Sequence, residues 1–221
     1  MPEKPVLPAL QERSRESRRK LLTAAIEVLG LHGIEGATIP RIARHAGLTP
    51  GSVYRRFKDK DALLETAILE ILERQDQTME TSLTPAASRI PLPVFAGKMI
   101  TGMVAAYRSN AGLLRGMRQF VQSRVNTPFF RKASALETAH FQRAVELFLS
   151  YGKQIRHPDP RTAVSLGLAM VAGTLFQVMV WSLDPKKLKE LLPLDDPALA
   201  RELTRAFLTY LGVSYDPAAI G

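Results

Sequence analysis

The sequence predicts an all-α protein with a small helical region at the N-terminus and a larger helical region after it. Apolar residues recur at three- and four-residue spacing along most of the 221 residues, which is the period of an amphipathic helix. The sequence contains no run of alternating apolar and polar residues that would predict a strand, and no internal repeat. Glycine- and proline-containing joints divide the helical pattern into segments.

The first expected helix is SRRKLLTAAIEVLGLHG, which ends at Gly33, a favoured residue at a helix C-terminus. Thr38 suits the N-cap of a second helix within ATIPRIARHAG. Pro40 falls in the first turn of that helix, where proline is tolerated, and Gly47 is expected to end it. The two helices are therefore separated by only a few residues.

A third, very short helix is expected after Thr49, which can act as its N-cap. Pro50 then occupies the first helical position, where its missing N–H group costs nothing. Asp59 is expected to cap a long helix through KDALLETAILEILERQDQ. A short helix, a tight turn and another short helix thus lie between two longer helices, which is the pattern of a helix-turn-helix domain.

The segment TPAASRIPLP contains three prolines and predicts a break at residues 84–93. Longer helices are expected beyond it, separated in part by the joints HPDP, DPKK and LDDP: 94–108, 111–124, 128–152, 160–183 and 197–212.

The chain is strongly basic, with a formal net charge of +9 and a pI of about 10.0. Such a charge favours polyanionic partners such as nucleic acid or acidic lipid. Basic residues exceed acidic ones in residues 1–60, and residues 81–136 contain no acidic residue at all. Cysteine is absent, which excludes disulfides and thiol nucleophiles. The first 20 residues lack an apolar signal core, so a cytoplasmic location is expected.

Residues 163–183 form an uncharged run of 21 residues, long enough to cross a bilayer. The polar residues within it, among them Thr174 and Gln177, weaken a membrane assignment. We favour a helix that is buried in the core or in an interface over a membrane span. A basic membrane-associated or architectural helical protein is one function class that this run and the basic charge leave open.

The stretch GLTPGSVYRRF, residues 47–57, suits insertion into DNA. A helix fills the major groove, and small residues at its start allow close approach to phosphates. Gly51 inside a helix costs about 1 kcal/mol relative to alanine, so a purely structural helix has little reason to contain it.

The segment TIPRIARHAGLTPGSVYRRFKDKDALL resembles the DNA-binding domain of TetR (tetracycline-repressor-like) transcriptional regulators. The resemblance covers about residues 14–65, and many positions agree in order and spacing. It implies an N-terminal arm at 1–13, a helix-turn-helix domain at 14–62, and an effector-binding and dimerisation domain at 63–221. It also implies a homodimer on a palindromic operator, most often a repressor, that a small-molecule effector releases.

The resemblance also assigns roles to individual residues of the DNA-binding domain. Tyr54 and Lys60 would contact phosphates, and Arg55 would reach a base or a phosphate. Pro50 replaces what is often a polar residue, so one contact is lost. Ile42, Ala43, Val53 and Phe57 are assigned to the core, and the choice between Arg55 and Arg56 as the base-reading residue stays open. The full candidate set is Thr38, Arg41, Thr49, Pro50, Gly51, Ser52, Tyr54, Arg55 and Lys60.

Residues 94–152 mix aromatic residues and methionines with the acid-free basic run, and some of them are expected to line an effector cavity. An amphiphilic or anionic effector would meet an arginine such as Arg108, Arg115 or Arg118. No cofactor and no metal are expected, because His, Asp and Glu do not cluster at ligand spacing. The candidate effector residues are Met103, Tyr107, Arg118, Phe120, Phe141 and Gln177.

Dimerisation is expected through residues 160–183 and 197–212, since a two-fold interface between helices would bury the apolar run. Gly167 and Gly173 would allow close approach of the helices there. An enzyme is the other rival class. The sequence contains no phosphate-binding glycine loop and no G-x-S-x-G motif, so no catalytic residue is expected.

Overall fold

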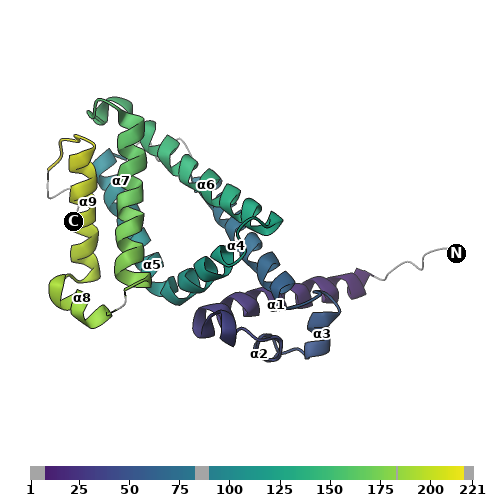
Figure 1. Cartoon of the computed structure of the whole chain (residues 1–221). Coiled ribbons are helices and arrows are strands. Elements are labelled where there is room, and N and C mark those ends of the chain that lie inside the picture. The colour runs from purple at the N-terminus through teal and green to yellow at the C-terminus, as the bar shows by residue number, and fades with distance from the viewer. Residues whose placement is uncertain (1–7, 83–89, 183, 217–221) are drawn as a thin grey trace. The chain divides into compact units, whose positions relative to one another are not determined.

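The computed structural model describes residues 8–82, 90–182 and 184–216, and every regular element in these ranges is helical. The all-α expectation is therefore confirmed. In chain order (Figure 1) the α-helices are α1 (Pro8–Gly36), α2 (Ile39–His45), α3 (Pro50–Tyr54), α4 (Lys60–Ser82), α5 (Leu92–Gln122), α6 (Pro128–Leu149), α7 (Pro160–Leu175), α8 (Pro185–Leu191) and α9 (Asp196–Tyr210). A short 3₁₀ turn, Gly152–Gln154, follows α6, and a π-helical turn, Phe176–Val180, follows α7.

Capping residues and glycines in the sequence correctly predicted where the first helices begin or kink. Gly33 has a left-handed φ of 66° and kinks α1 where the helix was expected to end, although helical turns continue to Gly36. Thr38 is the N-cap of α2, with its hydroxyl oxygen accepting from the Arg41 N–H. Asp59 accepts from the Ala62 N–H at 2.8 Å at the start of α4. Each signal acts through a backbone group that the helix itself leaves unpaired.

The turn between α2 and α3 differs slightly from the expectation. Helix α2 ends at His45, and Gly47 lies in the turn with a φ of 68°. The Leu48 N–H donates to the Ala43 carbonyl at 2.8 Å, which closes the end of α2 in the way typical of a glycine-terminated helix. Thr49 takes the N-cap position of α3 with extended backbone angles, but its side chain does not cap a backbone N–H.

The chain divides into two compact units, of which the first combines residues 1–72 with residues 112–133. The second segment belongs to this unit because the backbone of α5 approaches α1 closely at glycines. A Cβ atom at Gly112 would lie 2.3 Å from the Gly30 carbonyl oxygen, and one at Gly116 would lie 3.0 Å from Leu29 Cγ. The core joins α1, α2, α3 and α4 to Phe120 and Phe129 of this segment.

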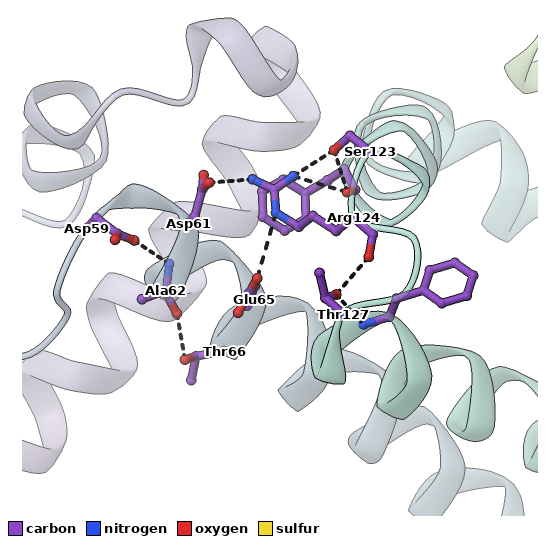
Figure 2. A network of polar contacts seen from close by, with 10 residues as sticks. Asp59, Asp61, Ala62, Glu65, Thr66, Ser123, Arg124 and Thr127 are labelled. Atoms are coloured by element: carbon purple, nitrogen blue, oxygen red, sulfur yellow. Dashed lines mark hydrogen bonds and ion pairs between the residues drawn. The ribbon is translucent and has the colours of Figure 1, made fainter.

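Arg124 connects the second segment of this unit to the start of α4 (Figure 2). Its Nη2 lies 2.6 Å from Asp61 Oδ2, and its Nε lies 3.7 Å from Glu65 Oε1. The third nitrogen, Nη1, donates to Ser123 Oγ at 2.7 Å and to the Phe120 carbonyl at 3.2 Å. The guanidinium carbon lies 3.5 Å from the centre of the Phe120 ring. Arg124, one of the basic residues in the acid-free run, therefore has its charge compensated inside the fold.

The second unit comprises residues 73–111 and 134–221. Phe148 and Phe207 pack edge to face in its core, with ring centroids 5.1 Å apart. Helices α7 and α9 meet where a Cβ atom at Gly167 would lie 2.7 Å from the Phe207 ring. Gly167 therefore serves packing within the chain, whereas space around Gly173 is open to 4 Å.

The joint expected at 109–110 is present as a kink in α5, because Asn110 has non-helical backbone angles (φ −115°, ψ 16°). Other segments of the second unit depart from the sequence expectation. The helix expected over 128–152 ends at Leu149. The joint DPKK begins a helix, α8, that was not expected, because Asp184 accepts from the N–H groups of Lys186 and Lys187. Residues 84–89 of the expected break lie outside the described residues.

The apolar run resembling a membrane span forms α7 and the π-helical turn. Over the described residues, Pro160–Val180 is one helical stretch long and apolar enough to cross a bilayer, with a mean hydropathy of 1.9, and 44% of that stretch is buried within the chain. This agrees with a helix that packs along one side only. Leu166, Met170 and Trp181 are exposed by 47%, 45% and 45%.

Candidate DNA-binding site

The helix-turn-helix element is held to its unit by four apolar side chains. Ile42, Ala43 and Val53 are fully buried, and Phe57 is 7% exposed. The sequence-based assignment of these residues to the core is confirmed. Because α3 is only five residues long, its orientation depends on this packing and not on its own helical stability.

The opposite side of α3 faces solvent and contains most of the predicted contact residues. Tyr54 is 61% exposed, although a tyrosine beside a complete apolar core is usually at least half buried. Both positively charged and small polar groups surround it. The exposed members of the predicted set are Thr38, Arg41, Thr49, Pro50, Gly51, Tyr54 and Arg55.

Two predicted contact residues, Ser52 and Lys60, are not exposed. Ser52 is only 8% exposed, because its hydroxyl group is enclosed by Thr49 and Arg55. Lys60 is half-buried, and its Nζ donates to the Ile34 carbonyl near the end of α1 at 3.2 Å. In this state both side chains are occupied by partners inside the protein. Their contacts with DNA stay predictions.

The three arginines of the element also differ in their partners. Arg41 donates to the Gly36 carbonyl at 2.8 Å from an exposed position. Arg55 donates to Ser52 Oγ at 2.9 Å and is exposed, whereas Arg56 is half-buried and donates to the Ser52 carbonyl at 3.0 Å. The two adjacent arginines that the sequence left equivalent therefore have separate environments.

His45 is the last residue of α2. Its Nε2 lies 2.7 Å from Glu27 Oε2 of α1. This contact joins α2 to α1 on the surface, where both side chains are well exposed.

The six candidate effector residues are divided between the two units. Arg118 and Phe120 belong to the first unit, and Met103, Tyr107, Phe141 and Gln177 belong to the second. Phe120 is fully buried in the core of the first unit, with the Phe129 ring centroid 5.7 Å away. The structure thus gives Phe120 a packing role that the sequence pattern did not distinguish from a cavity wall.

Arg108, considered as a partner for an anionic effector, forms a two-pronged ion pair instead. Its Nε lies 3.2 and 3.1 Å from the two carboxylate oxygens of Asp196 at the start of α9. The hydrogen bond to Arg108 lowers the pKa of Asp196 below its ordinary value, and the same bond raises the pKa of Arg108. The charge of Arg108 is therefore committed to this contact.

Sequence reasoning missed the role of Arg124, although a signal was present. Asp61 and Glu65 are like charges four residues apart on α4, an arrangement that destabilises an isolated helix. It indicates a cation from elsewhere in the fold, and Arg124 is that cation.

The family model described as "Bacterial regulatory proteins, tetR family" matches residues 21–67, which contain α2 and α3. The HTH-type transcriptional regulator BetI of Cronobacter sakazakii is 37% identical over 70 residues, so the match spans 32% of this chain and about a third (35%) of that relative. BetI of Escherichia coli O139:H28 is 26% identical over 195 residues, 87% of this chain and 92% of the relative.

A solved TetR-family structure from Mesorhizobium loti has the same fold, with a TM-score of 0.67 at 19% identity over 89% of this chain and 97% of that one. The named relatives are transcriptional regulators, in agreement with the expectation that the chain is not an enzyme. The family model covers the helix-turn-helix element, and the BetI match extends along most of the chain. Together these likenesses support a TetR-family transcriptional regulator.

Proposed function

We propose that the protein is a ligand-responsive, DNA-binding transcriptional regulator, most simply a repressor, that acts in the cytoplasm as a homodimer on a palindromic operator. One observation carries the DNA-binding part. A short helix with an apolar inner side, held by Val53, presents Tyr54, 61% exposed, and the exposed Arg55 on its outer side. The likeness to TetR-family regulators supports the same function.

On DNA, the outer side of α3 enters the major groove. Tyr54 donates its hydroxyl hydrogen to a phosphate, and the exposed residues before it, Thr49, Pro50 and Gly51, allow close approach of the backbone to the duplex. Thr38 and Arg41 contact the phosphates beside the start of α2. Lys60 contacts a phosphate only if it leaves the Ile34 carbonyl, a hydrogen bond of 3.2 Å.

The proposed dimer forms through residues 160–183 and 197–212. In support, Leu166, Met170 and Gly173 lie three or four residues apart on α7 and are exposed, so they form one apolar stripe. A Cβ atom at Gly173 would meet no atom within 4 Å, so the described residues do not cover this part of the stripe. A Leu166→Glu, Met170→Glu double variant is expected to be monomeric in sedimentation at micromolar concentration, and a wild-type monomer would contradict the proposal.

The proposed effector is an amphiphilic small molecule bound by the second unit. Met103, Tyr107 and Phe141 are half-buried there, which leaves part of each side chain able to contact a ligand, and Gln177 is exposed. Because Arg108 is paired with Asp196, an anionic head group would have to be bound by another cation. Calorimetric titration with carboxylated and with cationic lipophilic compounds tests this, and binding restricted to cations would contradict an anionic effector.

The central experiment is selection of bound DNA from a random pool by the full-length protein. We expect a palindromic sequence with half-sites about one helical turn apart, and a preference over random DNA of roughly three or more orders of magnitude. Arg55→Ala is expected to reduce this preference, whereas Lys98→Ala, an equal change of charge at an exposed position on α5, should keep it. Binding that ignores sequence would favour the membrane-associated or architectural alternative.

A further inference from the structure

Ser52 is unusual among the polar residues of the described chain. Only Ser52 and Thr204 among them are buried. Thr204 bonds to the Ala200 carbonyl of its own helix at 2.7 Å, which is the common arrangement for a helical threonine. The Ser52 hydroxyl group instead contacts two side chains, those of Thr49 and Arg55. A buried hydroxyl bonded in this way fixes the groups around it.

The direction of these hydrogen bonds follows from the donor inventory. Arg55 Nη2 lies 2.9 Å from Ser52 Oγ, and because a guanidinium group only donates, Ser52 accepts. The Ser52 hydroxyl hydrogen then needs an acceptor, and Thr49 Oγ1 lies 3.1 Å away. Donation from Ser52 to Thr49 satisfies the buried group. The Thr49 hydroxyl hydrogen then remains available to an acceptor outside the protein, because Thr49 is exposed.

Arg56 has a different role. Its Nη1 donates to the Ser52 carbonyl at 3.0 Å, and its Nε is buried with no hydrogen-bond partner among the described residues. Leaving this position would expose the Ser52 carbonyl at the end of α3. Arg56 therefore belongs to the framework of the helix, whereas Arg55 is exposed.

We infer that Ser52 is a positioning residue: it holds the Arg55 guanidinium group and turns the Thr49 hydroxyl group into an outward donor, and Arg55 is the arginine that reads the operator. The inference rests on the proposed DNA-binding function. Thr49 donates to a phosphate oxygen, and Arg55 donates to the acceptor edge of a guanine, the base whose major-groove edge suits a guanidinium group best. Ser52 itself makes no contact with DNA.

A mutant cycle on the operator that the wild-type protein selects tests this assignment. Arg55→Ala is expected to weaken binding by about 10- to 100-fold per half-site and to remove the preference at one base pair in each half-site. Ser52→Ala should cause a smaller loss and weaken the preference at the same base pair. In a Thr49→Val, Arg55→Ala background, Ser52→Ala should cause no further loss. Lys58→Ala, an equal loss of charge at an exposed neighbour, should leave the base preference unchanged.

Two results on DNA would overturn the inference. One is a loss from Ser52→Ala that persists in the Thr49→Val, Arg55→Ala background, because Ser52 would then contact DNA itself. The other is a base preference that survives Arg55→Ala and disappears in Arg56→Gln. A wild-type protein that selects no sequence would instead contradict the proposed function.

A measurement on the free protein distinguishes a failure of the positioning role of Ser52 from a failure of the proposed DNA-binding function. Side-chain NMR relaxation of the arginine Nε–H groups is expected to show faster motion of Arg55 in Ser52→Ala than in the wild-type protein, with Lys58→Ala unchanged. Arg55 motion that is the same in both proteins would refute the positioning role without any DNA. Alanine is a better helix former than serine, so the variant is expected to fold, and its thermal unfolding checks this.

Discussion

Arg124 Nη2 lies 2.6 Å from Asp61 Oδ2, which ties the second residue after the end of α5 to the first turn of α4. Asp61 immediately follows Lys60, and Asp59 caps the same turn (Figure 2). The segment 112–133 is therefore bound to the turn that leads out of the helix-turn-helix element. The contact joins this turn to a residue 63 positions further along the chain.

Arg124→Gln is expected to destabilise the first unit by about 1–2 kcal/mol. Removing the cation leaves two neighbouring carboxylates unpaired, but Asp61 is half exposed, so water compensates part of the loss. Urea unfolding at pH 7 measures the change. Arg15→Ala removes an exposed charge on α1 and should leave the unfolding free energy within about 0.5 kcal/mol of wild type. Equal stability of Arg124→Gln and wild type would contradict a stabilising role for the contacts of Arg124 with Asp61 and Glu65.

Two glycines of α5, Gly112 and Gly102, allow the same substitution to be compared at a closely packed position and at an open one. Gly112→Ala is expected to cost about 2–3 kcal/mol, because its Cβ would lie 2.3 Å from the Gly30 carbonyl oxygen and the backbones of α1 and α5 would have to separate. Gly102→Ala meets no atom within 4 Å and is expected to stabilise the chain by up to about 1 kcal/mol. Thermal unfolding of both variants checks the difference, and a Gly112→Ala protein as stable as Gly102→Ala would refute it.

Tyr54→Phe is expected to weaken DNA binding by roughly tenfold per half-site, because one hydrogen bond to a charged acceptor is lost. The loss should be similar on every operator variant, since a phosphate contact does not depend on sequence. Fluorescence anisotropy at fixed salt measures it. Stability should stay unchanged because the ring is 61% exposed. An effect confined to one base pair would show that Tyr54 reads a base.

Asp196→Asn tests the ion pair with Arg108 through its pH dependence. The pKa of Asp196 is lowered in the folded chain by the hydrogen bond from Arg108, so its contribution to stability is present above the unfolded value, near 3.8, and is lost as the pH falls through the folded value. Asp196→Asn should therefore be less stable than wild type at pH 7 and equal to it at about pH 2. A stability difference that does not change with pH would show that Asp196 acts by packing alone.

The sequence by itself determined the local structure of the helix-turn-helix element, and with it the resemblance to tetR-family regulatory proteins over residues 21–67. Caps at Thr38 and Asp59 and the left-handed Gly47 define the helix-turn-helix element through groups a few residues apart. The apolar spacing of Ile42, Val53 and Phe57 identified its inner side. Such signals can be read from a sequence because both partners of each interaction lie within one or two helical turns.

Only the tertiary structure decided which polar side chains are exposed and which form ion pairs or hydrogen bonds with distant parts of the chain. The pairs Arg124–Asp61, Arg108–Asp196 and Lys60–Ile34 join residues 63, 88 and 26 positions apart. No local periodicity encodes such distances. Arg55 and Arg56 are adjacent and chemically identical, and only the packing of α3 exposes one and half-buries the other. Burial and charge pairing depend on where distant segments meet, which the spacing of residues along a helix does not specify.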